Sequence, residues 1–401
     1  MKKIRTQIIR MGICIAKGFL NIIYFFVKMF PIKNKIVMLS RQSNKPSIDF
    51  ELIKKEILRK TGDIEIKVLC KVLKSNVKDR INYCFYILKC MYHIATSKVC
   101  ILDSYSIPIS ILKHKKSLEI IQIWHASGAT KKFGYQSLNK KEGRGEGVAK
   151  VMNMHKNYSH VMAPSRITGK FYSEAFQIDK NNIFINGLPR IDYLLNEDLG
   201  KEKIESFYKE YPKYKDKPTI LYVPTFRKDK DCSDVYRDLI DSINFEKYNL
   251  IIKLHPLDKS AEMDKYIINK KYNTFDLLKI ADYIITDYSA VAFETSVLNK
   301  PLYFYVYDIN EYKKTRGLNV NPLKEMKNST STNIKEIINS IENNSYNYEE
   351  LEKFRSKYIQ KVDKNNTKRL VNFVFKYLGK DVENEENKNS INENSKEKLG
   401  I

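Results

Sequence analysis

Short apolar runs alternate with helical patterns along most of the chain. Six runs come first, at residues 35–40, 64–70, 99–103, 118–125, 160–165 and 183–187. Four more follow, at residues 219–226, 249–256, 283–286 and 302–306. Strands that alternate with helices are typical of a parallel sheet with helices on both faces. The pattern therefore predicts an α/β fold built from two similar β/α halves, with a cleft between their two rows of strand ends.

Changes of composition mark the borders of these halves. A linker rich in Lys, Glu, Tyr and Pro, roughly residues 199–218, separates the two sets of runs. We therefore predict an N-terminal domain at 33–198 and a C-terminal domain at 199–380. Residues 381–401 carry almost no large apolar side chains and are predicted to be a disordered tail. A polar, glycine-rich segment at 135–154 is predicted to be a mobile loop beside the functional site.

The first 32 residues are apolar except for one polar stripe. On a helical wheel five polar side chains fall within about 40° of one another, and these are Lys3, Arg10, Lys17, Asn21 and Lys28. The longest uncharged stretch is about half of the ~20 residues that a membrane-spanning helix needs. No small-residue cleavage site of a signal peptide follows. We predict that residues 1–32 form an amphipathic helix in the plane of an anionic membrane surface; a helix packed on its own protein is the alternative.

Charge and cysteine usage narrow the class of protein. The 71 Lys and Arg residues outnumber the 47 Asp and Glu residues, which gives a formal charge of +24. This charge favours a negatively charged partner: a phosphorylated substrate, a membrane surface or a nucleic acid. The six cysteines are scattered without a C-x-x-C pair, so we expect free thiols in a reducing cytoplasm and no zinc site or disulfide framework.

The run that ends at Ile123 carries the candidate chemistry. It delivers Trp124, the only tryptophan, and then His125 to the carboxyl end of a strand, where open α/β sheets bind their ligands. The small residues 126–130 allow backbone N–H groups to approach an anion, and Lys131 and Lys132 add positive charge. The pattern places a proton acceptor beside an anion-binding loop.

Three shorter motifs end other strands. Arg190 lies in NGLPRID and is suited to a bidentate phosphate contact, although a surface arginine in a turn fits equally. VPTFR offers Thr225 and Arg227, and KLHP offers Lys253 and His255. A histidine before proline is held extended, so His255 is a candidate phosphate donor, with a structural role as the alternative.

The motif TDYSAVAFE runs from a strand into a helix. It supplies Thr286, Asp287 and Ser289, and unpaired N–H groups of the first helical turn suit a diphosphate. Helix capping is the alternative for Asp287 and Ser289. Glu294, about two turns further on, is a candidate hydrogen-bond acceptor for a ribose or polyol.

Five ordered motifs carry a family resemblance. IWHASGATKKFG, GLPRID, VPTFR, KLHP and TDYSAVAFETSVLNKPLYFYVYD resemble those of the CDP-glycerol glycerophosphotransferases of Gram-positive wall teichoic acid synthesis, over roughly residues 35–376. The WHASGA form, the length and the N-terminus are most similar to the primases of this family, whereas its polymerases tend to carry WHGTP. The resemblance implies a GT-B architecture of two Rossmann-like domains facing a cleft, and peripheral attachment to the cytoplasmic face of the membrane.

The resemblance also implies substrates and roles. The donor would be CDP-glycerol, and the acceptor a ManNAc-GlcNAc disaccharide linked to undecaprenyl diphosphate. His125 resembles the general base that deprotonates the acceptor hydroxyl, while His255, Arg190 and Ser289 would neutralise charge on the diphosphate as CMP leaves. Glu294 resembles the acidic position that holds the donor, although family members often have Asp there. Lys131 and Lys132 would meet the diphosphate of the acceptor or form a solvated patch, and Asp103 would line the acceptor side or cap a turn.

Other expectations concern cofactors and partners. No His-x-x-x-His or Asp-x-Asp pattern lies near the motifs, so we predict no obligatory metal, with magnesium allowed on the donor. A polymerase or capsule-polymer phosphotransferase, a transferase for CDP-ribitol, and a GT-B glycosyltransferase that uses a sugar nucleotide are the enzymatic alternatives. A non-catalytic nucleic-acid-binding protein is the third class, and it leaves the strand-end histidines unexplained, so we predict no nucleic-acid partner. A homo-oligomer or a complex of teichoic acid enzymes is a further expectation.

Overall fold

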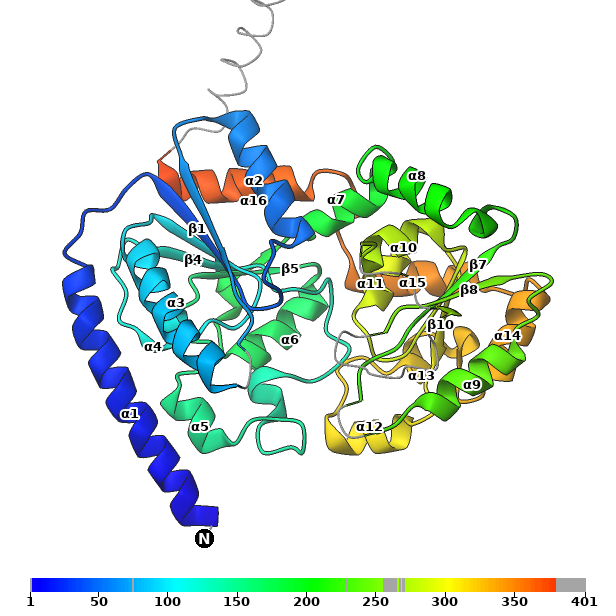
Figure 1. Cartoon of the computed structure of the whole chain (residues 1–401), viewed down its shortest axis with the longest axis horizontal. Helices are drawn as coiled ribbons and strands as arrows, with labels where there is room; N and C mark the ends of the chain where they lie inside the picture. Colours follow the sequence, from blue (N-terminus) through cyan, green and yellow to red (C-terminus); the bar gives the residue numbers. More distant parts are fainter. Residues whose placement is uncertain are drawn as a thin grey trace, which may run out of the picture.

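The N-terminal half of the chain folds around one parallel sheet (Figure 1). The computed structural model describes residues 2–73, 76–227, 230–254, 265–266, 268 and 271–379. The strands of this sheet are β1 (Lys35–Ser40), β2 (Glu65–Cys70), β3 (Val99–Leu102), β4 (Glu119–Gln122), β5 (His160–Ala163) and β6 (Ile183–Ile185). They lie in the order β2-β1-β3-β4-β5-β6, and each neighbouring pair is parallel.

Helices cover both faces of this sheet. They are α2 (Ile48–Lys60), α3 (Val77–Ala95), α4 (Ile107–Ile111), α5 (Glu146–Val151) and α6 (Arg166–Phe176). One hydrophobic cluster joins Val37 and Leu102 to side chains of α3 and α6, and a second joins Ile36 and Ile101 to α2. Since successive strand residues point to opposite faces, burial on both faces explains why the strands are continuous apolar runs.

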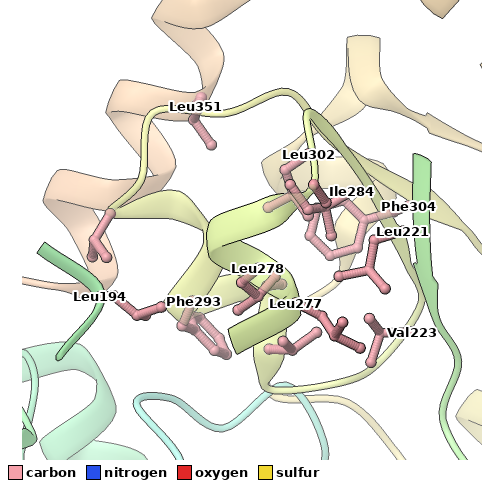
Figure 2. Close-up of a cluster of buried hydrophobic side chains, with 14 of the residues drawn as sticks. Leu194, Leu221, Val223, Leu277, Leu278, Ile284, Phe293, Leu302, Phe304 and Leu351 are labelled. Carbon is pink, nitrogen blue, oxygen red and sulfur yellow. The ribbon is translucent and has the colours of Figure 1, made fainter. Parts of the chain in front are cut away.

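A second parallel sheet forms the C-terminal half. Its strands are β7 (Thr219–Val223), β8 (Asn249–Ile252), β9 (Tyr283–Thr286), β10 (Leu302–Tyr305) and β11 (Thr330–Ser331), in the order β11-β10-β9-β7-β8. The helices around it are α8 (Lys201–Glu210), α9 (Ser233–Ser242), α10 (Thr274–Ile280), α11 (Val291–Ser296), α12 (Ile309–Thr315), α13 (Pro322–Glu325), α14 (Ile334–Glu342) and α15 (Tyr348–Tyr358). Figure 2 shows one of its two cores, in which Leu221 and Ile284 of the sheet meet Leu277 of α10 and Phe293 of α11. The predicted α/β fold with two parallel-sheet halves is confirmed.

Short polar motifs begin several helices at the expected places. Ser47 accepts a hydrogen bond from the Phe50 N–H at the start of α2, and Ser165 accepts one from Thr168 at the start of α6. Asn273 opens α10 with a reciprocal capping box. These side chains satisfy N–H groups that a helix leaves unpaired.

Two helices tie the halves together. α7 (Pro189–Leu195) leaves the first sheet, yet its Ile191 and Leu194 lie in the core of the second half. The last described helix, α16 (Asn366–Leu378), returns to the first half, where Leu370 and Phe375 pack in the cluster beneath α2. The segment assigned from sequence to a domain at 199–380 thus contributes its final helix to the other half, because α16 has an apolar face that only the first sheet covers.

The N-terminal helix α1 (Lys2–Val27) lies along the outside of the first half (Figure 1). Two side chains of its polar stripe contact the protein: Asn21 Nδ2 donates to the carbonyl of Ile111 (3.0 Å), and Lys17 Nζ donates to that of Val151 (3.4 Å). The opposite face is apolar and exposed, with Ile15, Phe19 and Phe26 each more than 60% accessible. The protein-facing side of α1 also carries apolar side chains, since Tyr24 is fully buried and Leu20 and Ile23 pack against the core of the first half. α1 therefore combines a mixed inner face with an exposed apolar outer face.

Candidate active site

His125 lies just beyond the carboxyl end of β4, on the side of the sheet that faces the second half. The preceding residue, Trp124, has a left-handed backbone (φ 61°), and its N–H donates to Oε1 of Gln122 at 2.9 Å. The Trp124 ring stacks on Phe133, with 5.0 Å between centroids, and lies 4.2 Å from the imidazole of His125. This tight turn and the aromatic wall beside it fix the orientation of the imidazole.

The hydrogen bonds of His125 define its reactive nitrogen. Nδ1 lies 3.1 Å from the carbonyl oxygen of Asp103, and the side-chain amide of Gln42 lies 3.2 Å from the same nitrogen. A carbonyl can only accept, so a bond to Asp103 requires the proton on Nδ1 and leaves Nε2 as an acceptor. A protonated Nδ1 cannot also accept from the Gln42 amide, which then lies against the imidazole without donating to it. Burial lowers the pKa of His125 to about 4, and the charges of Arg190 and Lys131 add to this effect. The imidazole is therefore neutral at pH 7 and can accept a proton.

Arg190 holds the backbone of this histidine. Its Nη1 donates to the carbonyl oxygen of His125 at 2.7 Å, while Nε and Nη2 donate to the carboxylate of Asp49. Glu294 lies 3.4 Å from Nη1, and burial raises the pKa of its carboxyl. Arg190 is 6% exposed. The NGLPRID motif predicted a phosphate contact for Arg190. Its guanidinium instead donates to protein acceptors, so Arg190 positions the backbone of His125.

Glu294 joins the two halves. It lies at the fourth position of α11, and its Oε1 accepts a hydrogen bond from the N–H of Ser127 at 2.9 Å, in the loop after His125. The next residue, Gly128, packs directly against Phe293 of α11, since a Cβ at this position would lie 2.2 Å from the Phe293 ring. The predicted anion-binding loop is thus held against the second half by a hydrogen bond and by close packing.

Gly128→Ala is expected to disturb this contact. The added methyl group forces the loop away from Phe293, so we expect the activity of this site to fall about 10-fold or more and the free energy of unfolding to fall by about 1 to 3 kcal/mol. Initial rates and denaturant unfolding measure the two effects. Gly62→Ala is the matched control, because no atom lies within 4 Å of its added Cβ; equal behaviour of the two variants would contradict the prediction.

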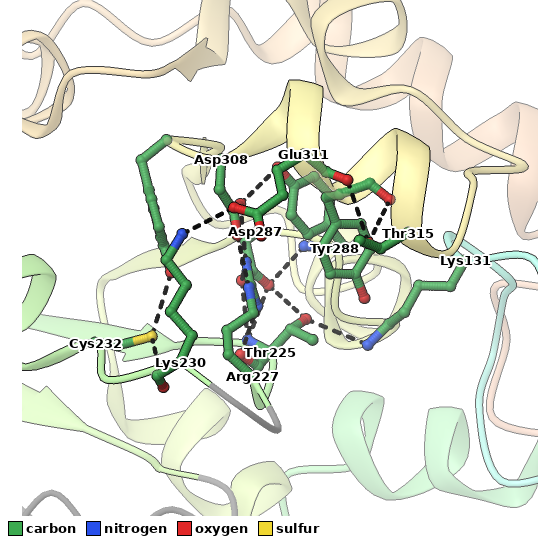
Figure 3. A network of polar contacts seen from close by, with 12 residues as sticks. Lys131, Thr225, Arg227, Lys230, Cys232, Asp287, Tyr288, Asp308, Glu311 and Thr315 are labelled. Atoms are coloured by element: carbon green, nitrogen blue, oxygen red, sulfur yellow. Dashed lines mark hydrogen bonds and ion pairs between the residues drawn. The ribbon is translucent and has the colours of Figure 1, made fainter. Parts of the chain in front are cut away.

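A buried polar network occupies the facing edge of the second sheet (Figure 3). Asp287 accepts hydrogen bonds from the N–H of Thr225 (2.9 Å) and from its hydroxyl (2.6 Å), and lies 3.0 Å from Nη2 of Arg227. Arg227 also donates to both carboxylate oxygens of Asp308, at 2.8 and 3.1 Å. The Tyr312 ring lies 4.9 Å from its guanidinium. Thr225, Arg227 and Asp287, predicted to bind substrate, therefore bind one another and shape the wall of the site.

Lys131 reaches into this network from the N-terminal half. Its Nζ lies 3.3 Å from Oγ1 of Thr225 (Figure 3). Burial lowers the pKa of Lys131 to about 8, while Asp287 opposes the change and Arg316 and Arg227 support it. The ammonium is mostly charged at pH 7, and it offsets the second carboxylate of a network that holds two aspartates and one arginine. Lys131 is thus placed to meet an anion between the halves.

The remaining predicted residues have four different outcomes. Thr286 is fully buried and donates to the carbonyl of Val223 at 2.7 Å, which is a structural role. Ser289 and Lys132 are partly exposed beside the same network. Lys253 Nζ donates to the carbonyl of Tyr272 at 2.8 Å. His255 lies outside the described residues.

The backbone of the loop after His125 also forms hydrogen bonds with the second half. Lys131 pairs with Leu318 in an antiparallel bridge, the N–H of Lys132 donates to Gly317 (3.0 Å), and the N–H of Asn319 donates to Thr130 (2.8 Å). Residues 126–132 and 317–320 therefore form a continuous seam next to His125.

Sequence reasoning did not single out three contributors: Gln42, Asp49 and Asp308. Asp49 stands in the first turn of α2 and looks like an ordinary helix-start carboxylate. Asp308 belongs to the quoted motif that ends in YVYD, which was the one available signal for it. Gln42 follows β1 without any motif. Their roles depend on partners more than 80 positions away in the chain.

Comparison with known proteins agrees with this geometry. A family model described as CDP-glycerol:poly(glycerophosphate) glycerophosphotransferase matches residues 22–376. The teichoic acid ribitol-phosphate primase of Bacillus spizizenii (strain ATCC 23059 / NRRL B-14472 / W23) is 29% identical over 378 residues, covering 91% of this chain and 97% of that protein. The glycerol-phosphate primase of Bacillus subtilis (strain 168) is 29% identical, covering 89% and 95%. The poly(ribitol-phosphate) polymerase of the same B. spizizenii strain is 30% identical, covering 88% of this chain and 58% of that protein.

Solved structures give the fold. The wall teichoic acid polymerase TagF matches with a TM-score of 0.70 and 18% identity, over 94% of this chain and 98% of that chain. UDP-GlcNAc 2-epimerase from Neisseria meningitidis bound to UDP-GlcNAc matches with a TM-score of 0.56 and 13% identity, over 85% and 100%.

The fold, with its two parallel-sheet halves and a site between them, is that of the GT-B-like enzymes. Within that class, the chain belongs to the CDP-glycerol:poly(glycerophosphate) glycerophosphotransferase family. It is therefore an enzyme, a transferase of teichoic acid biosynthesis. The family predicted from the five motifs is confirmed.

Proposed function

We propose that this enzyme transfers glycerol phosphate from CDP-glycerol to a hydroxyl of a ManNAc-GlcNAc disaccharide linked to undecaprenyl diphosphate, with release of CMP, and so acts as a primase. The observation that carries the proposal is His125, a neutral imidazole whose Nε2 is left as an acceptor at the seam between the halves. The WHASGA form around it supports the primase role, as does the match to two primases along 95% or more of their own length.

The chemical step follows from this geometry. Nε2 of His125 takes the proton of the acceptor hydroxyl as its oxygen attacks the β-phosphorus of the donor. The bond between the β-phosphorus and the bridging oxygen breaks, and CMP leaves with that oxygen and its electron pair. Lys131, charged and partly buried beside Thr225, is suited to offset the negative charge that develops on the leaving phosphate. With this charge supplied by protein groups, we propose that no metal is obligatory.

CMP release tests the proposal. The full chain is given CDP-glycerol with and without the lipid-linked disaccharide, and CMP is followed over time. One equivalent of CMP for each acceptor supports the primase role, and release over many equivalents supports a polymerase. No release with this donor, together with UDP release from a UDP-sugar, would overturn the proposed donor class.

CDP-ribitol is the second candidate donor. The B. spizizenii ribitol-phosphate primase is as similar in sequence as the B. subtilis glycerol-phosphate primase, at 29% each. The same assay with CDP-ribitol separates the two, because the correct polyol gives the higher kcat/KM.

We also propose that α1 and α3 attach the enzyme to the cytoplasmic face of an anionic membrane. Residues Gln7–Val27 are long and apolar enough to span a membrane by length and composition, and little of this stretch is buried in the protein. A helix that spans the membrane would lose the contacts of Lys17 and Asn21 with the protein body, so an orientation in the membrane plane fits better. α3 packs beside α1 and exposes Val77 (72%), Ile81 (55%) and Phe85 (67%) along one stripe. No Asp or Glu precedes Asp49, which suits an anionic surface.

The double variant Ile81→Gln, Phe85→Gln is expected to bind vesicles of anionic phospholipid about 10-fold more weakly, because two exposed apolar side chains no longer enter the lipid. Sedimentation with vesicles measures the binding. Leu58→Gln with Phe245→Gln is the control, since these side chains are also exposed but lie on other surfaces. Unchanged vesicle binding, or a change of oligomeric state in sedimentation velocity, would show that lipid is not what covers this stripe.

A further inference from the structure

Two arginines of the N-terminal half, Arg41 and Arg144, have no acidic partner among the described residues and lie around one tyrosine near His125. Arg41 follows β1, next to Gln42, which contacts His125. Arg144 lies in the loop before α5. Both guanidinium groups flank one side chain, Tyr105: the Arg41 carbon lies 5.8 Å from its ring centre and the Arg144 carbon 5.5 Å. Within the described part of the chain, neither forms an ion pair.

Arg41 is held in place but keeps donors free. Its guanidinium also lies 5.9 Å from the ring of Tyr83, its Nη1 donates to the Tyr105 carbonyl at 3.3 Å, and its backbone N–H donates to Ser104 at 3.0 Å. Its Nε is buried and has no hydrogen-bond partner among the described residues. The cavity between Arg41, Tyr83 and Ser104 has a volume of about 10 Å³, which holds no more than one water molecule, so a larger anion would meet Arg41 from outside it. An oriented arginine with unused donors is suited to an anion.

The other arginines of the site differ in this respect. Arg190 is engaged by Asp49, Glu294 and the His125 carbonyl, and Arg227 by Asp287 and Asp308. Their charges are already balanced by carboxylates. Arg41 is partly buried, and a partly buried guanidinium without a carboxylate is costly unless a ligand supplies the negative charge. Arg144 is exposed, so its guanidinium is open to a ligand that approaches Arg41.

The position of α3 indicates which anion this is. Tyr83 lies on the inner face of α3 and holds Arg41, whereas Val77, Ile81 and Phe85 lie on its outer, exposed face. Arg41 therefore lies between this apolar outer surface and Gln42, which contacts His125. Arg144 adds an exposed guanidinium over the same Tyr105 ring. A molecule with a lipid tail outside, an anionic group in the middle and a hydroxyl at His125 matches this order.

We infer that Arg41 and Arg144 form a site for the diphosphate of the lipid-linked acceptor, separate from the donor side at Lys131. The inference rests on the proposed function and adds a binding site to it. The sequence motifs had suggested Lys131 and Lys132 for the acceptor diphosphate. We assign Lys131 to the donor instead, because it contacts Thr225 in the polar network of the second half.

The test compares an acceptor that carries a diphosphate with one that lacks it. Arg41→Gln, Arg144→Gln and the double variant of the full chain are assayed for CMP release with a short-chain alkyl-diphosphate disaccharide, and with the same disaccharide as an uncharged alkyl glycoside. Arg166→Gln, an exposed arginine at the start of α6, is the control. We expect each substitution to raise the KM for the diphosphate acceptor about 10-fold or more, with the KM for CDP-glycerol and for the uncharged acceptor unchanged.

Three outcomes would overturn the inference. They are an equal effect on both acceptors, no effect on either, and an effect seen only when the acceptor is presented in anionic vesicles, which would assign the arginines to lipid headgroups. Calorimetric binding of the alkyl diphosphate alone needs no turnover. Wild-type binding that is lost in the double variant supports the site even if CMP release fails with every donor, and equal binding by both proteins refutes it.

Discussion

His125→Gln is expected to lower kcat by about 10²- to 10⁴-fold, with little change in the KM for the CDP-linked donor, because the variant keeps a polar side chain but removes the proton acceptor. The Nδ1 contact to the Asp103 carbonyl presents Nε2 to the substrate, and glutamine cannot reproduce that geometry. Rates of CMP release at saturating acceptor measure the effect.

The pH dependence provides a second readout of the same residue. Burial lowers the pKa of His125 to about 4, so the basic form persists in the free enzyme well below the ordinary value near ~6.5. We expect kcat/KM to fall on the acid side only below pH ~5, because this quantity reports the free enzyme. A bound diphosphate adds negative charge and raises the pKa of the imidazole, so the acid limb of kcat should lie at higher pH.

His160→Gln is the matched control. This partly exposed histidine stands at the amino end of β5, the opposite edge of the same sheet, where Nε2 lies 2.7 Å from the Tyr377 hydroxyl. Its substitution should leave kcat and both pH limbs unchanged. If His125→Gln retains more than a tenth of the wild-type kcat, or both variants lose activity equally, His125 is not the base.

Asp49→Asn is expected to lower the free energy of unfolding by about 3 to 5 kcal/mol, because it leaves the buried guanidinium of Arg190 without its main counter-charge. Arg190 is 7% exposed at its side chain and Asp49 is 1% exposed, so water cannot replace the lost partner. Activity should fall as well, since Arg190 also holds the His125 carbonyl at 2.7 Å. Denaturant unfolding and CMP release measure the two effects.

A second substitution separates stability from positioning. Asp49→Asn combined with Arg190→Met removes both charges, so the free energy of unfolding should recover in part while activity stays low, because His125 has still lost its anchor. Glu51→Gln, on the exposed side of the same helix, is the control and should change neither quantity. A double variant that regains activity would show that Arg190 does not position His125.

Features that depend on neighbouring residues in the chain were predicted well from the sequence. The strand at 35–40 has the bounds predicted for it, and most other strands fall within the predicted runs, because burial on both faces requires a continuous apolar segment. The family followed from five short motifs in order, and it is confirmed. The two-residue strand β11 was not predicted, since so short a segment carries no periodicity.

The roles of individual charged residues were harder to predict. Arg190, Arg227 and Asp287 were identified as site residues, but a motif does not state whether an arginine faces a phosphate or a carboxylate. Their partners Asp49 and Asp308 are 141 and 81 positions away. The orientation of α1 was equally hard to predict. The helical wheel identified the polar stripe, but only the tertiary contacts show that Lys17 and Asn21 face the protein.

The sequence by itself determined the two β/α halves, the family and the position of His125 at a strand end, because apolar periodicity and motif order are local properties of the chain. The tertiary structure decided which charges are paired inside the protein and which, such as those of Arg41 and Arg144, have no carboxylate partner among the described residues. It also decided that α16 packs on the first half and that Gly128 contacts Phe293. These features depend on which distant segments meet, and pairing between distant segments is set by the packing of the whole fold.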